Sequence, residues 1–110
     1  MAKNKDVQEI NERDIDSVIK KNKICIIDFY ADWCMPCVMM SPIIDELAQS
    51  YVDKISFFKI NVDENKGASV KFKVMGIPTL LVFKKGQVVD RIVGSVSFDV
   101  LSDRLKKYLS

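Results

Sequence analysis

The apolar residues of this chain change their spacing several times, and this change of period limits the folds open to it more than any other feature. Residues 12–20 carry apolar side chains three and four positions apart, as on one face of a short helix. Residues 23–31 form an almost continuous apolar run, which is typical of a strand buried on both faces, and a second run follows at residues 54–62. Strands of this kind need helices to cover them. The pattern therefore predicts an α/β domain.

The segment after the first apolar run has a helical period from residue 34 to about residue 51. Pro42 lies inside it and cannot donate a hydrogen bond to the carbonyl of Val38, so we expect a kink. The positions expected on the buried side are Val38, Ile43, Ile44, Leu47 and Ala48.

The second half of the chain continues the alternation of strands and helices. Residues 64–72 predict a short helix or turn, and residues 78–94 predict two strands that form a hairpin at residues 85–86. A final helix is expected after Ser97, which is a good N-cap residue. Strand, helix, strand, helix, hairpin and helix together describe strands that are joined by crossover helices.

Length and charge exclude several classes of protein. A chain of 110 residues suits one domain over residues 1–110. Its 17 basic and 15 acidic side chains are too balanced to indicate a nucleic acid or an anionic membrane as partner. No apolar run approaches the roughly 20 residues that span a bilayer, and the first residues lack the features of a secretory signal. We therefore expect a cytoplasmic protein.

Histidine is absent from the chain. Nucleophiles activated by an imidazole and metal sites built from imidazole are excluded by this absence. Any chemistry must come from cysteine, carboxylate, lysine and tyrosine side chains or from the backbone.

Cys34 and Cys37 have the spacing C-x-x-C, which fits a structural clip, a metal site or a redox pair. A clip would close a loop of four residues and add only roughly 2 kcal/mol. A zinc site needs more ligands, and the remaining thiol, Cys25, lies in an apolar run where cysteine usually packs as a small hydrophobic residue. A metal shared by two chains remains the weaker alternative.

The position of the pair favours electron transfer. Cys34 falls where a buried strand ends and a helix begins, and the partial positive charge of a helix N-terminus stabilises a thiolate. Pro36 suits the first turn, because its missing N–H would have no partner inside the helix. We expect the N–H of Cys37 to donate to the Cys34 sulfur, and Cys37 to be the less exposed thiol. Cys34 would then attack a substrate, and Cys37 would resolve the mixed disulfide.

Four segments of the chain together resemble the thioredoxin family. They are DFYADWCMPC at residues 28–37, KINVDEN at 59–65, GIPTLLVFKKG at 76–86 and VG at 93–94. A single C-x-x-C is a weak signal, but the four segments in this order are specific, and the resemblance extends over about residues 6–109. It implies a central mixed sheet of five strands flanked by four helices. It also implies electrons from NADPH through a separate flavin reductase, or from ferredoxin.

The resemblance assigns roles to several residues of this chain. Cys34 and Cys37 match the redox pair, and Trp33 matches the ring beside it. Asp28 matches a buried aspartate behind the pair, and Lys59 matches the lysine close to that aspartate. Ile77 and Pro78 match the dipeptide of the family's cis-proline, and Gly94 matches a glycine of the substrate groove. The substrate-binding residues expected are Trp33, Met35, Pro36, Met75, Ile77, Pro78 and Gly94.

Asp28 has two interpretations. It lies in a run that should be buried on both faces, where an unpaired carboxylate is unfavourable. In one interpretation it is a structural carboxylate that the backbone or Lys59 satisfies. In the other, burial raises its pKa and it takes the proton of Cys37 through a water molecule. The resemblance favours the second.

Two positions depart from the common pattern of the family. Met35 stands where glycine is usual, and Val38 stands where a basic residue is common. We expect Met39 and Met40 to pack in the core, whereas Met35 and Met75 flank the redox pair. Flexible, polarisable side chains there suit varied peptide surfaces. These departures affect the reduction potential and the choice of reductase rather than the class of reaction.

The sequence thus indicates a monomeric dithiol–disulfide oxidoreductase that reduces disulfides in proteins, with no bound cofactor and no metal. One alternative is an oxidase, an isomerase or a glutaredoxin-like enzyme, although the C-x-P-C centre is less typical of these. The other is a binding subunit with the same fold, in which the thiols have no catalytic role.

Overall fold

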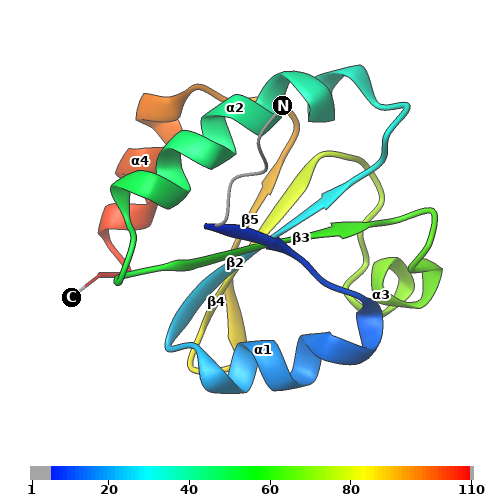
Figure 1. Ribbon diagram of the computed structural model, residues 1–110, viewed down its shortest axis with the longest axis horizontal. Helices are drawn as coiled ribbons and strands as arrows, with labels where there is room; N and C mark the ends of the chain where they lie inside the picture. Colours follow the sequence, from blue (N-terminus) through cyan, green and yellow to red (C-terminus); the bar gives the residue numbers. More distant parts are fainter. Residues whose placement is uncertain (1–5, 110) are drawn as a thin grey trace.

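The computed structural model describes residues 6–109 of the chain (Figure 1). Within this range, the strands are β1 (Val7–Glu9), β2 (Ile24–Tyr30), β3 (Ser56–Asn61), β4 (Thr79–Lys84) and β5 (Gln87–Val93). The helices are α1 (Ile15–Lys21), α2 (Met35–Ser50), α3 (Lys66–Lys71) and α4 (Phe98–Lys106), and a single 3₁₀ turn, η1 (Glu12–Asp14), precedes α1.

The strands form one mixed sheet in the order β1-β3-β2-β4-β5, which confirms the architecture implied by the family resemblance. Strands β1, β3 and β2 are parallel, whereas β4 pairs antiparallel with both β2 and β5. Strand β2 is therefore the central strand, and its long apolar run is explained by helices on both sides. The short strand β1 has no clear pattern of its own in the sequence.

Two helices cover each face of the sheet, with α2 and α4 on one side and α1 and α3 on the other (Figure 1). The side chains of β2 alternate between these faces, as in any strand. Ile24 and Ile26 pack in the core under α2 and α4. Cys25, Ile27 and Phe29 pack in the core on the opposite face. The two hydrophobic cores thus share the central strand.

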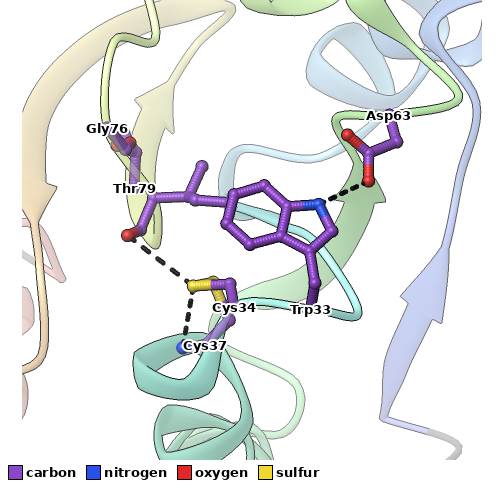
Figure 2. Close-up of a disulfide and its surroundings, with 7 residues drawn as sticks. Trp33, Cys34, Cys37, Asp63, Gly76 and Thr79 are labelled. Atoms are coloured by element: carbon purple, nitrogen blue, oxygen red, sulfur yellow. Dashed lines mark hydrogen bonds between the residues drawn. A yellow bond between two sulfur atoms is a disulfide. The ribbon is translucent and has the colours of Figure 1, made fainter.

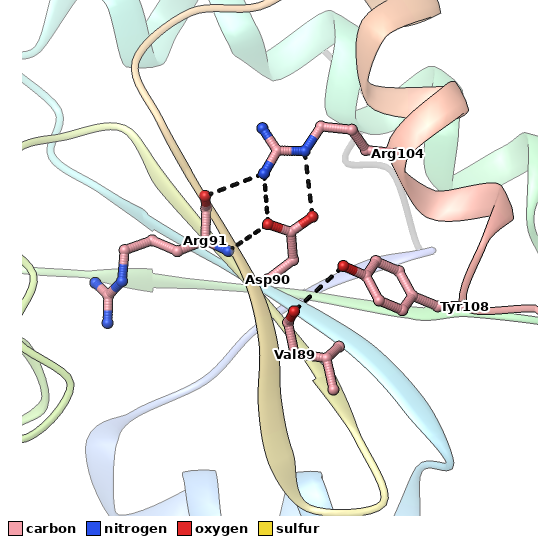
Figure 3. A network of polar contacts seen from close by, with 5 residues as sticks. All are labelled: Val89, Asp90, Arg91, Arg104 and Tyr108. Carbon is pink, nitrogen blue, oxygen red and sulfur yellow. Dashed lines mark hydrogen bonds and ion pairs between the residues drawn. The ribbon is translucent and has the colours of Figure 1, made fainter.

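Helix α4 is held against β5 by polar contacts as well as by apolar packing. Arg104 forms a two-point ion pair with Asp90 of β5, and the hydroxyl of Tyr108 donates to the carbonyl of Val89 at 3.2 Å (Figure 3). At its start, Ser97 is the N-cap and accepts a hydrogen bond from the N–H of Val100, as its position in the sequence predicts.

The buried side of α2 differs from the one predicted. Its buried residues are Cys37, Met40, Ile44, Leu47 and Ala48. These positions recur every three or four residues, so Val38 and Met39 turn outward and are 52% and 68% exposed. The prediction that Val38 and Met39 are buried is therefore wrong, whereas Met40 does pack in the core.

Helix α2 continues through Pro42, which lies on its exposed side. The carbonyl of Val38 loses its intrahelical partner there, but water can reach that side of the helix. Over residues 6–109, no helix is both long enough and apolar enough to cross a membrane.

Candidate active site

Cys34 and Cys37 form a disulfide at the N-terminus of α2 (Figure 2). Cys34 is the N-cap residue, with an extended backbone (φ −87°, ψ 106°), and its Sγ accepts a hydrogen bond from the N–H of Cys37 at 3.2 Å. Pro36 occupies the first turn. The chain therefore places a sulfur where a helix presents free N–H groups, as predicted, and these groups stabilise negative charge on the Cys34 sulfur.

The two cysteines do not differ in exposure as predicted. Cys34 is 4% exposed and Cys37 is 5% exposed, so both are buried in the disulfide form. They differ in their surroundings. The Sγ of Cys34 lies 3.8 Å from the carbonyl oxygen of Ile77, at the surface formed by the turn before β4. Cys37 lines a cavity, partly open to solvent, together with Asp28.

Asp28 is buried behind the disulfide, on the central strand. Its exposed fraction is 7%, and within residues 6–109 no donor forms a hydrogen bond with its Oδ1 atom. Burial raises its pKa to about 7, and the positive charge of Lys59 partly offsets this rise. Both effects agree with the prediction, and the carboxylate can therefore change its protonation state near neutral pH.

A cavity of about 220 Å³ connects the carboxylate with the redox pair. Asp28, Lys59 and Cys37 line it, together with Tyr30 and Ser41. Its volume is sufficient for water molecules, each of which occupies about 30 Å³ in the liquid. A proton can therefore move between the Cys37 sulfur and Asp28 through water within this space.

Trp33 lies on the outer side of the disulfide and is 70% exposed. Its indole Nε1 donates a hydrogen bond to Oδ2 of Asp63 at 2.8 Å, which fixes the ring beside Cys34 (Figure 2). The backbone N–H of Asp63 in turn donates to the Asn61 side chain. Asp63 is not among the predicted site residues, although it lies in the segment KINVDEN that carries part of the resemblance.

The turn before β4 faces Cys34 from the other side. The peptide bond between Ile77 and Pro78 is cis, as the family resemblance implies. The Thr79 hydroxyl donates to the carbonyl of Gly76, and the N–H of Gly94 donates to the carbonyl of Pro78 at 2.8 Å. Gly94 has a φ of +88°, a conformation that favours glycine. These contacts bring the predicted residues of this turn and Gly94 together next to the disulfide.

Large apolar side chains are exposed on the segments next to the disulfide. Met35 and Met75 are 65% and 95% exposed, as expected for side chains that flank the site. A cavity of about 400 Å³ lies beside Trp33, lined also by Met75, Ile77 and residues of α3. Exposed apolar side chains are therefore present on both segments that flank the disulfide, where a polypeptide can contact them.

Cys25 lies apart from the redox pair. It is fully buried, it packs in the core on the face of α1 and α3, and burial raises its pKa to about 11. The prediction that it is a core residue is confirmed. In the described part of the chain, no group of three or more His, Cys, Asp or Glu side chains is arranged to hold a metal ion.

Comparisons with known proteins agree with this geometry. The sequence model of the family described as Thioredoxin matches residues 6–107. The chain is 41% identical over 103 residues to thioredoxin from Staphylococcus aureus, covering 94% of this chain and 98% of that protein. It is 38% identical over 107 residues to the chloroplastic M-type thioredoxin of Spinacia oleracea, covering 96% of this chain and 59% of the length of that relative.

A solved structure gives the same result for the fold. The structure of a mutant thioredoxin from Halobacterium salinarum NRC-1 superposes with a TM-score of 0.89 at 34% sequence identity. The superposition covers 100% of this chain and 96% of that one.

Proposed function

Because the chain belongs to the thioredoxin family, it is a protein dithiol–disulfide oxidoreductase, and we propose that Cys34 attacks the substrate and Cys37 resolves the intermediate. The observation that supports these roles is the position of each sulfur. Cys34 caps α2 and lies beside the carbonyl of Ile77, whereas Cys37 lines the cavity that contains Asp28.

The reaction consists of two thiol–disulfide exchanges. The Cys34 thiolate attacks one sulfur of the substrate disulfide, so that a mixed disulfide forms and the other substrate sulfur leaves as a thiolate. Cys37 then attacks the Cys34 sulfur and releases the second substrate sulfur. The substrate gains two electrons, and the Cys34–Cys37 disulfide is left for a reductase.

Asp28 is the proton acceptor of the second exchange. Cys37 must lose its proton before it can attack, because the thiolate is the nucleophile. Asp28 shares the cavity with Cys37, and its pKa of about 7 suits proton transfer at neutral pH. Lys59 tunes this acceptor, because its positive charge lowers the pKa of Asp28.

The apolar surface around the disulfide binds the substrate polypeptide. An extended segment of the substrate pairs with the backbone of Ile77, as in strand addition. The side chains in contact with it are Trp33, Met35, Pro36, Met75, Ile77, Pro78 and Gly94.

Further properties follow from the family. Electrons come from a separate reductase linked to NADPH or to ferredoxin, and the protein works without a bound cofactor in electron transport and cell redox homeostasis. It acts as a single-domain monomer in the cytoplasm. Met35 and Val38 are exposed beside the redox pair, so they influence which reductase docks.

The roles of the two cysteines can be tested by trapping. Cys37→Ser should accumulate mixed disulfides with a disulfide-containing protein such as insulin, because the intermediate can no longer be resolved. Cys34→Ser should accumulate none. Non-reducing electrophoresis and mass spectrometry measure the adducts. Equal trapping by the two variants, or trapping by Cys34→Ser alone, would show that the nucleophile is assigned incorrectly.

Whether the protein acts as a reductant or as an oxidant can be tested by measuring its reduction potential. The reduction potential of the Cys34/Cys37 couple, determined against glutathione, should lie on the reducing side of the glutathione couple. A potential well on the oxidising side would favour the oxidase or isomerase alternative.

A further inference from the structure

Lys59 lies between two carboxylates of neighbouring strands. Its partner in the parallel pairing with β2 is Asp28, and its partner in the parallel pairing with β1 is Glu9. Side chains at paired positions of parallel strands point to the same face of the sheet. The three residues therefore form a row on the face covered by α2, with Lys59 on the strand between the two acidic residues and its positive charge acting on Asp28.

The side chain of Tyr30 extends along this row, from β2 across β3 to β1, on one face of the sheet. It lies on β2 two residues after Asp28, so its side chain is on the same face. Its hydroxyl donates a hydrogen bond to Oε2 of Glu9 on β1, although β3 separates these two strands. The side chain must pass over β3 to make this contact. The Nζ atom of Lys59 lies 5.5 Å from the centroid of its ring, within the range of a cation–π interaction.

Several ionisable groups surround Lys59 and Tyr30. Burial raises the pKa of Tyr30, and its hydrogen bond to Glu9 and the charges of Glu9 and Asp32 raise it further, so the hydroxyl remains a donor at neutral pH. Asp45 on α2 also faces Lys59, whose charge partly offsets the effect of burial on its pKa. The ionisable groups within this row or next to it are Glu9, Asp28, Tyr30, Asp32, Cys37, Asp45 and Lys59.

We infer that Tyr30 is a positioning residue for the proton-transfer step: its hydroxyl engages Glu9 and its ring covers Lys59, so that the ammonium acts on Asp28. The inference rests on the proposed role of Asp28 as proton acceptor. The structural basis is that Tyr30 makes both contacts at once, one to the competing acid and one to the shared cation. Without the hydroxyl, Glu9 is free to draw Lys59 away from Asp28.

The test is the pKa of Asp28, measured from its side-chain carboxyl ¹³C shift in the oxidised protein. Tyr30→Phe keeps the ring and removes the hydrogen bond to Glu9. We expect about a threefold decrease in the acid dissociation constant of Asp28, the size of the effect of one partly exposed charge pair. Tyr30→Leu removes the ring as well and should decrease it further. Equal values for these two variants would exclude a role for the ring.

Two double variants show whether the effect acts through Lys59. In a Lys59→Met background, Tyr30→Phe should leave the pKa of Asp28 unchanged. In a Glu9→Gln background, Tyr30→Phe should no longer raise it, because the competing charge is gone. A shift that persists without Lys59, or no shift in Tyr30→Phe alone, would overturn the inference.

Tyr108→Phe is the matched control. Tyr108 also donates its hydroxyl to another segment and has a lysine over its ring, with Lys107 Nζ at 5.4 Å, but its hydrogen bond is to β5, at the opposite edge of the sheet from β1. This variant should leave the pKa of Asp28 unchanged.

A kinetic readout separates the inference from the proposed function. The pH midpoint for resolution of the mixed disulfide should move upward in Tyr30→Phe together with the pKa of Asp28. If Asp28→Asn resolves the intermediate at the wild-type rate, the proposed role of Asp28 fails, whatever Tyr30→Phe does to the pKa. If Asp28→Asn is slow but Tyr30→Phe leaves the pKa unchanged, the inference alone fails.

Discussion

At the residue scale, the carboxylate of Asp28 lies between Ile27 and Phe29 on the central strand and is 7% exposed. Its pKa rises from 3.8 to about 7 because burial disfavours the charged form. Between these two values the folded state binds more protons than the unfolded state, so its stability falls as the pH rises. The unfavourable contribution is absent below about pH 4 and complete above about pH 7.

Asp28→Asn should therefore stabilise the oxidised protein by roughly 2 to 4 kcal/mol at pH 7 and by almost nothing at pH 4. The same variant should slow the resolution of mixed disulfides, because Cys37 loses its proton acceptor. Urea unfolding midpoints at both pH values and rates of insulin reduction at pH 7 measure the two effects. A variant that is less stable and equally fast would identify Asp28 as a satisfied structural carboxylate.

Cys25 provides the contrasting case of a cysteine with no role in the reaction. It is fully buried and its pKa is raised to about 11, so the thiolate is scarce and inaccessible. We expect it to resist alkylation by iodoacetamide in the native oxidised protein. Cys25→Ala should lower the free energy of unfolding by about 1 to 2 kcal/mol and leave disulfide reduction unchanged. Rapid labelling together with loss of activity would contradict this.

At the element scale, the side chain of Arg91 on β5 forms hydrogen bonds with the C-terminal end of α3. The guanidinium of Arg91 donates to the carbonyls of Phe72 and Lys73 at 2.6 Å and 3.3 Å. These carbonyls lack partners within the helix, as at any helix end. The segment that follows carries Met75 and Ile77 to the disulfide, so Arg91 supports the substrate-binding turn from behind.

Arg91→Met should loosen this segment. Loss of roughly 1 kcal/mol of local stability corresponds to about fivefold faster amide exchange of residues 72–76. The KM for a protein disulfide should rise with little change in kcat, because the chemical groups are untouched. Arg104→Met is the matched control, since Arg104 contacts β5 at Asp90 and at the backbone carbonyl of Arg91 (Figure 3), and its helix α4 covers the face of the sheet opposite to α3 (Figure 1). Equal exchange in both variants would show that Arg91 has no special role.

At the scale of the whole molecule, the two hydrophobic cores have the central strand in common. Ile26 packs on the α2 and α4 side, and Ile27 packs on the α1 and α3 side. Neither core can lose its packing without exposing the other face of the same strand. The two halves of the protein should therefore unfold together.

We accordingly predict one cooperative unfolding transition for the oxidised protein. Far-UV circular dichroism, which follows the helices, and near-UV circular dichroism, which follows the aromatic side chains, should give the same urea midpoint. Two separate midpoints would show that the cores are independent and that residues 1–110 do not behave as one domain.

Local sequence patterns were enough to predict the elements that have a long, regular period. The apolar run at residues 23–31 predicts the central strand, and the cap at Ser97 predicts the start of α4, because each signal is local to the segment that contains it. The redox pair was also evident, since Cys34 and Cys37 are close in the sequence and lie at a strand-to-helix junction. The order of the five strands and the cis state before Pro78 were available only through the family resemblance.

The remaining features depend on contacts between segments that are distant in the sequence. Strand β1 spans only three residues, too few to show a period, and it is defined by its pairing with β3. Val38 and Met39 are apolar yet exposed, because the rotation of α2 is set by the sheet beneath it. The contacts of Trp33 with Asp63 and of Tyr30 with Glu9 join residues 30 and 21 positions apart. Such pairs meet only after the strands have taken their places, since sequence patterns describe neighbours along the chain and not neighbours across a sheet.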